Sequence, residues 1–166
     1  MASSSSSIYG SNPPEYDVFL SFRGEDTRKN FTCHLNDALI RSGIITFIDN
    51  REVEKGDEIS SLLSNAIRSS SISIIIFSQN YASSSWCLNE ILEILECYKT
   101  RRQIILPIFY HVSPSDIKKQ NGSYGEAFAK HEERFKEMKE KVRKWRAALT
   151  QVATLSGWEL KPDDEQ

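Results

Sequence analysis

The sequence predicts a single α/β domain with a parallel sheet covered by helices on both faces, and three observations support this. Short apolar segments alternate with segments of helical periodicity, which indicates strands joined by right-handed crossovers. Two of the apolar segments, at 72–77 and 103–110, are apolar at almost every position, as strands are when helices cover both faces of their sheet. The 166 residues, 39% of them hydrophobic, suffice for one globular domain with its own core.

Strands and helices are expected to alternate in the first half of the domain. A strand at 16–22 (YDVFLSF) is followed by a helix in which apolar residues recur every three to four positions, from Phe31 until Gly43. A second strand is expected at 44–48. The apolar positions of the next helix begin at Ile59 and continue to Ile67.

The third and fourth strands are expected at 72–77 and 103–110, with a helix between them whose apolar face includes Leu88 and Leu95. Pro107 lies within the fourth strand and predicts a local irregularity there, because proline cannot donate a hydrogen bond to a neighbouring strand. A loop is expected after this strand.

Segment 124–156 is expected to be helical throughout. Its apolar residues form one stripe with a spacing of three to four, and its charged residues form i, i+4 pairs on the other faces. The stripe consists of Phe135, Met138, Val142, Trp145, Leu149 and Val152. Gly157 is expected to end the helix, and 158–160 to form a short edge strand.

These elements favour a flavodoxin-like, three-layer fold with four to five strands in the order 2-1-3-4-5. That order places the first and third strands side by side at the centre of the sheet. A ligand crevice is then expected at their carboxyl ends, where the chain reverses direction across the sheet. The segments expected around it are 23–27, 49–56 and 78–90.

The two ends of the chain differ in composition from the domain. Residues 1–15 are rich in serine and proline and lack the basic start and apolar stretch of a signal peptide. Ala2 excludes N-myristoylation, and no apolar run approaches membrane-spanning length. We expect a disordered segment at 1–15, the folded domain at 16–160 and a polar tail at 161–166.

Composition excludes several classes of site. The three cysteines show no CxxC spacing, which is typical of reduced thiols in a cytosolic or nuclear protein. The three histidines lie far apart in the sequence, so no metal site is expected. With a net charge of −2 and a pI near 6.0, the domain has no overall field that would recruit nucleic acid or an anionic membrane.

The first two crevice loops each allow two interpretations. Gly24 permits close backbone approach and Arg23 offers a planar set of donors suited to phosphate, but the same segment also fits a polar turn with a helix N-cap at Asp26 or Thr27. The second loop, from Asp49 to Gly56, has the charge and the terminal glycine of a mobile lid. On the residues alone, an ordinary surface loop is favoured there.

The third loop leads into a helix for which Ser84 or Ser85 can act as the N-cap. Glu90 falls off the apolar stripe of this helix and lies in its early turns, near the strand ends. It is either a catalytic carboxylate or, as is commoner for a lone helix glutamate, a solvated one. Trp86 either stacks on a heterocycle or belongs to the core.

The chemistry available to one carboxylate is restricted. Ordinary glycosidases use two carboxylates because the leaving oxygen must be protonated, and no second acid is evident near Glu90. A different case is the cleavage of nicotinamide from a ribose, because nicotinamide leaves its cationic ring form as a neutral molecule and needs no proton. One carboxylate that stabilises the cationic sugar would suffice for that reaction. A phosphoacceptor receiver with the same strand order is excluded, because Ser78 and Gln79 stand where its aspartate is needed.

Six ordered segments, at 16–39, 43–50, 55–59, 73–94, 105–128 and 145–160, resemble the TIR (Toll/interleukin receptor-like) domains of plant nucleotide-binding, leucine-rich-repeat immune receptors. The resemblance implies a flavodoxin-like fold and a signalling role in plant innate immunity. It also implies hydrolysis of NAD⁺, as a substrate and with no further cofactor, to nicotinamide and ADP-ribose or its cyclic isomers.

The resemblance assigns roles to particular residues. Glu90, in the WCLNE segment, corresponds to the catalytic glutamate of the family. The positions implied for substrate binding are Phe22, Arg23, Gly24, Glu25, Asp26, Thr27, Asp49, Gly56 and Trp86. Asp49 and Trp86 correspond to family positions less directly than the others do.

The resemblance also implies weak homo-oligomers formed through TIR–TIR contacts, and contacts with other TIR domains. One family surface centres on a Ser-His pair, here Cys33 and His34, and the second includes Gly157. The lid loop of one protomer is expected to complete the pocket of its neighbour. The alternative function is a non-catalytic adaptor that needs His34 and Gly157 but not Glu90.

Family domains usually continue past the SGW segment into a further helix. Here the sequence stops at Gln166, so it is either a receptor fragment or a TIR-only protein. Without that helix, apolar surface is expected along one edge of the sheet, and the second association surface is expected to be weaker.

Overall fold

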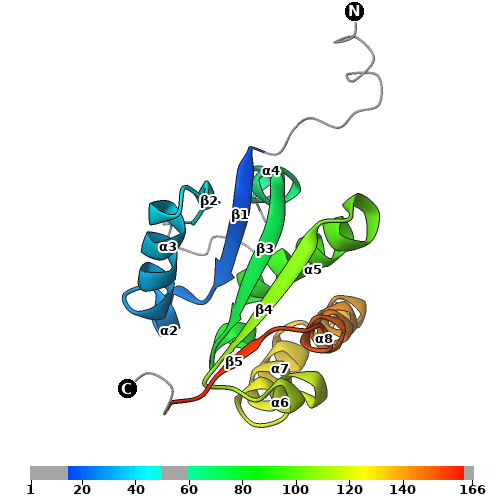
Figure 1. Ribbon diagram of the computed structural model, residues 1–166. Coiled ribbons are helices and arrows are strands. Elements are labelled where there is room, and N and C mark those ends of the chain that lie inside the picture. The colour runs from blue at the N-terminus through cyan, green and yellow to red at the C-terminus, as the bar shows by residue number, and fades with distance from the viewer. Residues whose placement is uncertain (1–14, 50–59, 163–166) are drawn as a thin grey trace, which may run out of the picture.

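The computed structural model describes residues 15–49 and 60–162, and its centre is a five-stranded parallel sheet in the order β2-β1-β3-β4-β5 (Figure 1). The strands are β1 Tyr16–Phe22, β2 Thr46–Phe47, β3 Ser70–Phe77, β4 Ile104–Tyr110 and β5 Trp158–Leu160. The predicted fold class and strand order are therefore confirmed. Most of the predicted lead-in 1–15, Gly56 and the last four residues lie outside the described residues.

Helices connect the strands. They are α2 Gly24–Thr27, α3 Phe31–Arg41, α4 Ser61–Arg68, the 3₁₀ helix η1 Tyr81–Ser83, α5 Ser85–Arg101, α6 Pro114–Lys119, α7 Ser123–Arg134 and α8 Lys139–Ala153. In the described part of the chain, no helix combines the length and the apolar character needed to cross a bilayer.

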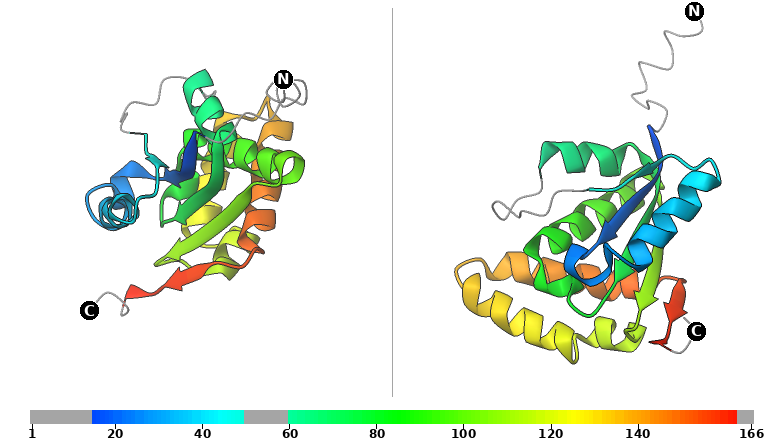
Figure 2. Two further views of the ribbon diagram at one scale, coloured as in Figure 1. Left: turned by 45° about the horizontal axis from the view of Figure 1, so that its top comes forward. Right: turned by 90° about the vertical axis from the view of Figure 1, so that its left-hand side faces the viewer.

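Alternate residues of the strands belong to two hydrophobic cores. Phe19 and Ile75 face α4, α5 and α8, whereas Leu20 and Ile76 face α3. The left view of Figure 2 shows the sheet between α3 on one side and α5 and α8 on the other. This arrangement accounts for the apolar character of both faces of β3, as the sequence pattern predicted.

The register brings the carboxyl ends of the central strands together. β1 pairs with β3 along its whole length, from Tyr16 opposite Ser70 to Phe22 opposite Ile76. The segment after β1 runs to α3 on one face, and the segment after β3 runs to α5 on the other. The two connections diverge, so they leave an opening at this edge of the sheet.

The prediction of a continuous helix over 124–156 is wrong. The chain leaves α7 after Arg134 and begins α8 at Lys139. Phe135, in the break, is buried edge-on against Trp145 with 5.3 Å between ring centroids, whereas Met138 is 49% exposed. Burial of Phe135 between the two helices takes precedence over the helical periodicity, which continues through the break.

Two short helices and one strand also differ from the expectations. α2 occupies the predicted turn after β1. α6 occupies the predicted loop after β4, with Pro114 in its first turn and Ser113 as its cap, accepting a hydrogen bond from the Ser115 amide. β4 runs through Pro107 without the expected irregularity, and its pairing with β5 begins one residue later, at Ile108.

A buried histidine joins α7 to the segment after β3. The Nε2 of His131 donates a hydrogen bond to the Ala82 carbonyl oxygen at 2.7 Å, and its ring packs against those of Phe135 and Trp145. Burial lowers the pKa of His131 below its ordinary value of 6.5; the positive charge of Arg134 adds to this, and the hydrogen bond to Ala82 opposes it.

We expect the folded state to lose stability as the pH falls below 6.5. In that range His131 binds a proton more readily in the unfolded chain than in the folded chain, where its pKa is lower. Above that pH the neutral ring is present in both states and the contribution is complete. Urea denaturation of the parent and of His131→Phe at pH 7.5 and 5.5 measures the effect. The variant, which cannot take up this proton, should lose less stability over the interval; an equal loss in both chains would contradict the assignment.

Candidate functional site

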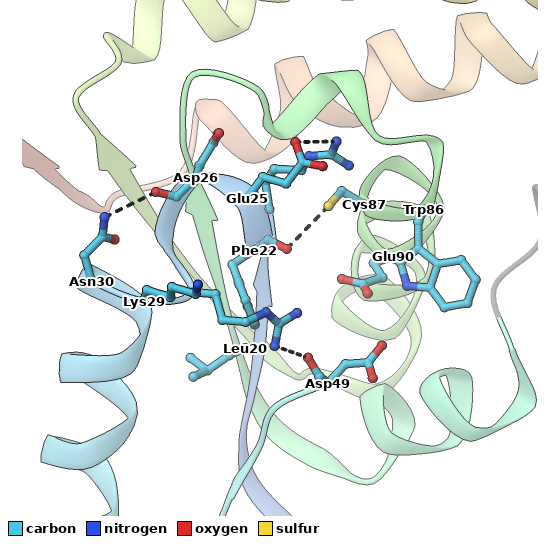
Figure 3. A pocket seen from close by; sticks show the side chains of 13 residues that line it. Leu20, Phe22, Glu25, Asp26, Lys29, Asn30, Asp49, Trp86, Cys87 and Glu90 are labelled. Atoms are coloured by element: carbon cyan, nitrogen blue, oxygen red, sulfur yellow. Dashed lines mark hydrogen bonds and ion pairs between the residues drawn. The ribbon is translucent and has the colours of Figure 1, made fainter. Parts of the chain in front are cut away.

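A cleft of about 630 Å³ opens at the carboxyl ends of β1 and β3 (Figure 3). Its walls are Leu20, the segment from Phe22 to Asn30 except Thr27, Asp49 after β2, and residues in the first two turns of α5. Each of the three segments expected at the crevice contributes described residues to it.

Glu90 lies in this cleft, and its side chain is directed inward. It is 5% exposed, and its Oε1 accepts a hydrogen bond of 2.7 Å from the Ser21 hydroxyl. The alternative of a solvated surface glutamate is therefore wrong. Figure 3 shows the Glu90 carboxylate pointing towards Phe22 and Asp49.

The start of α5 determines where Glu90 lies. The Ser84 hydroxyl accepts a hydrogen bond from the Cys87 amide at 3.1 Å, so Ser84 is the N-cap. Trp86 and Cys87 precede Glu90 by four and three residues, so all three lie on one side of the helix and line the cleft. Trp86 is half-buried and also packs against the core, so it has features of both interpretations made from the sequence.

Arg28 is a cleft residue that the sequence analysis did not select. Its Nη1 donates to the Asp49 carbonyl oxygen at 2.9 Å, and its guanidinium lies 4.9 Å from the centre of the Phe22 ring. A Cβ atom on Gly24 would lie 3.0 Å from the Arg28 Nη2. Gly24 therefore leaves room for a guanidinium group at the cleft, and Arg28 connects the Asp49 segment to β1.

Asp26 and Thr27 have different surroundings. Asp26 lines the cleft, and its carboxylate accepts hydrogen bonds from the Ser78 hydroxyl and from the amide and side chain of Asn80. Thr27 is buried, with its hydroxyl 2.7 Å from that of Thr32, and it does not line the cleft. Neither residue is an N-cap, because the N-cap positions are Arg23 for α2 and Asn30 for α3.

Arg23 and Glu25 both line the cleft, Arg23 with a largely buried side chain and Glu25 with an exposed one. The Arg23 Nη2 is 3.4 Å from the Glu25 Oε2, and the Glu25 side chain is largely exposed. Together with Arg28 and Lys29, Arg23 supplies positive charge to the cleft. Such a group of cations is suited to a phosphate-bearing ligand.

Ser21 and Tyr81 contact the site from behind, and the sequence analysis missed both. Each is fully buried, and their oxygens are 2.8 Å apart. The only sequence signal was a polar residue, Ser21, inside an otherwise apolar strand end.

Comparison with known proteins decides the family. The sequence profile of the TIR domain matches residues 15–166. The chain belongs to the TIR domain family. It is 55% identical over 148 residues to the disease resistance protein RPV1 of Vitis rotundifolia, a match covering 89% of this chain and 10% of RPV1. It is 49% identical over 157 residues to the TMV resistance protein N of Nicotiana glutinosa, covering 95% of this chain and 13% of that protein. The chain thus spans about a tenth of the length of these relatives.

A solved structure supports the same assignment. The TIR domains in the structure of the activated Roq1 resistosome, which directly recognises the pathogen effector XopQ, align with a TM-score of 0.82 and 51% identity over 88% of both chains. The similarity of this TIR domain to those of plant disease resistance proteins therefore extends from sequence to fold.

The residues expected to mediate self-association lie on two separate parts of this TIR domain. Cys33 and His34 are exposed on α3, which packs on the side of the sheet near β2. Gly157 is exposed just before β5, at the opposite edge of the sheet (Figure 1). Both positions are accessible at once in the described chain.

Proposed function

We propose that this TIR domain self-associates and hydrolyses NAD⁺ to nicotinamide and ADP-ribose or its cyclic isomers. The observation that carries the proposal is the buried Glu90 carboxylate, held by Ser21 and directed into a cleft at the carboxyl ends of the central strands. The volume of the cleft, about 630 Å³, falls within the usual range of small-molecule sites.

One carboxylate suits the chemistry of this bond. As the bond between ribose C1′ and the pyridinium nitrogen breaks, its electron pair stays on nitrogen and nicotinamide leaves as a neutral molecule. The positive charge moves to the sugar, where a fixed carboxylate with little access to water stabilises it strongly. Water then adds to C1′ and releases a proton, which gives ADP-ribose. No acid is needed for the leaving group, in contrast to ordinary glycoside hydrolysis.

The rest of the cleft matches the rest of the substrate. Arg23, Arg28 and Lys29 line it and can contact the pyrophosphate. Carboxylates line the same cleft, and that of Glu25 pairs with Arg23. Trp86, half-buried beside Glu90, offers an aromatic surface for a heterocycle. Asp49 lies where it can accept hydrogen bonds from a ribose or an amide.

Self-association and cellular role are part of the same proposal. The exposed Cys33–His34 face of α3 and the surface around Gly157 are the contacts we assign to TIR–TIR association. We also propose a cytosolic or nuclear location, on the ground that the three cysteines show no CxxC spacing. The names of the relatives place them in plant disease resistance, and we propose the same setting for this chain.

Nicotinamide release tests the proposal. The chain, alone and fused to an oligomerising partner, is incubated with NAD⁺, and nicotinamide is measured by chromatography. Fusion raises the local concentration of the domain, so release should increase about tenfold or more. If neither protein releases more nicotinamide than buffer does, the proposed activity is wrong.

The adaptor function remains the second candidate because the α3 face is accessible independently of the cleft. A cell-death assay in leaf tissue separates the two. Signalling that survives Glu90→Ala but is lost with His34→Ala supports the adaptor, whereas loss with both variants supports an enzyme that must assemble.

A further inference from the structure

A chain of hydrogen bonds runs behind Glu90, through Ser21 and Tyr81, which do not themselves line the cleft. The Ser21 hydroxyl lies 2.7 Å from the Glu90 Oε1 and 2.8 Å from the Tyr81 hydroxyl. The Tyr81 hydroxyl is also 3.3 Å from the Cys87 carbonyl oxygen. Ser21 and Tyr81 are fully buried on the side of the sheet that packs against α5.

The direction of these hydrogen bonds follows from the protons available. An ionised carboxylate only accepts, so Ser21 must give its single proton to Glu90. Tyr81 also has one proton, and the Ser21 oxygen is the nearer of its two acceptors. Burial raises the pKa of the Tyr81 phenol well above its usual range, so this group remains a donor. The order is therefore Tyr81 to Ser21 to Glu90, with both hydroxyl dipoles directed at one carboxylate oxygen.

The end of β1 thus contacts the start of α5 at two points. Besides the Ser21–Glu90 bond, the Cys87 thiol lies 3.5 Å from the Phe22 carbonyl oxygen. A serine hydroxyl buried among apolar side chains costs stability unless it is hydrogen-bonded. Its partner here is the carboxylate, which fixes the rotation of the Glu90 side chain relative to the strand.

We propose that Ser21 and Tyr81 are positioning residues that hold the Glu90 carboxylate ionised and directed into the cleft. This inference rests on the proposed NAD⁺ hydrolysis for its catalytic meaning, but its physical content is a statement about Glu90 alone. The other charged and titratable groups that line the cleft with Glu90 are Arg23, Glu25, Asp26, Arg28, Lys29, Asp49 and Cys87, and the variants below leave all of them in place. Burial of a carboxylate favours its neutral form, and a donated hydrogen bond favours the charged form. Removing the donors should therefore raise the pH at which Glu90 takes up a proton.

The variants are Ser21→Ala, Ser21→Thr and Tyr81→Phe, with Ser73→Ala as the matched control. Ser73 is a buried serine on the neighbouring strand β3, and its hydroxyl has no hydrogen-bond partner among the described residues. Two readouts are taken on the full chain: the pH profile of kcat and KM for nicotinamide release, and the titration of Glu90 by ¹³C NMR of carboxyl-labelled glutamate. Glu90→Gln identifies the resonance.

Ser21→Ala should lower kcat at neutral pH about tenfold, with a smaller change in KM. The acid limb of its profile and the Glu90 titration should both move to higher pH. Tyr81→Phe should move them less in the same direction, while Ser21→Thr and Ser73→Ala should keep the parental titration. Should Ser21→Ala fail to fold, Tyr81→Phe, which loses one oxygen, decides the question.

The titration separates this inference from the proposed function. If Glu90 titrates in Ser21→Ala as it does in the parent, the positioning role is wrong even if the parent is active. If Ser21→Ala does not fold, the same conclusion follows from an unchanged titration in Tyr81→Phe. A parent that releases no nicotinamide overturns the enzymatic proposal, while a shifted titration still supports the hydrogen-bond chain.

Discussion

Replacing Gly157 by alanine is expected to reduce the free energy of unfolding by about 3 kcal/mol, because the new atom overlaps the neighbouring strand. A Cβ at this position would lie 2.1 Å from the Pro107 carbonyl oxygen and 2.7 Å from its Cγ. The Pro107 backbone belongs to β4 and cannot move aside without disturbing the sheet. Urea denaturation measures the loss, and Ser156→Ala, at the exposed neighbouring residue, is the control expected to change little.

This result would change how Gly157 variants are interpreted. Loss of self-association in Gly157→Ala would follow from displacement of β5 even if no partner touched the glycine. Trp158, which is 61% exposed, is a better probe of the same surface, because replacing it creates no such overlap. A Gly157→Ala chain as stable as the parent would show that β4 and β5 adjust more easily than these distances imply.

The second large effect is expected for Trp145→Ala, at about 3–5 kcal/mol of lost stability. Trp145 is fully buried in α8, its ring packs against Phe135, and its Nε1 donates to the Asn89 Oδ1 at 3.1 Å. Asn89 precedes Glu90 in α5. The cavity should therefore also loosen the helix that carries the site.

Trp158→Ala provides the matched comparison, since it removes the same side chain from an exposed position. Thermal and urea denaturation should show a large loss for Trp145→Ala and a small one for Trp158→Ala. Equal losses would contradict the assignment of Trp145 to the core between α5 and α8.

The sequence predicted those features that depend on local periodicity. Both ends of β1, at Tyr16 and Phe22, follow from its apolar pattern and the polar turn after it. The strand order placed the cleft, and the helical spacing after Ser84 placed Glu90 at its edge. These predictions succeeded because the spacing of apolar residues along a strand or helix reflects which of its faces is buried.

Features that depend on contacts between distant segments were not predictable in this way. Ser21 meets Glu90 and Tyr81 across separations of 69 and 60 residues, and no local pattern indicates such a meeting. Asp26 was expected to bind substrate or cap a helix, and its carboxylate binds the turn after β3. The break at Phe135 likewise reflects the packing of α7 against α8, which the uninterrupted apolar spacing concealed.

The central claim is that Glu90 performs the chemistry, and the rate of nicotinamide release by Glu90→Gln tests it most directly. Glutamine keeps the size of the side chain and removes its charge, whereas Glu96→Gln removes the same charge from an exposed position on α5 outside the cleft. The proposed mechanism predicts that release falls about 100-fold or more in Glu90→Gln and stays at the parental rate in Glu96→Gln. Equal rates in the parent and in Glu90→Gln would contradict it.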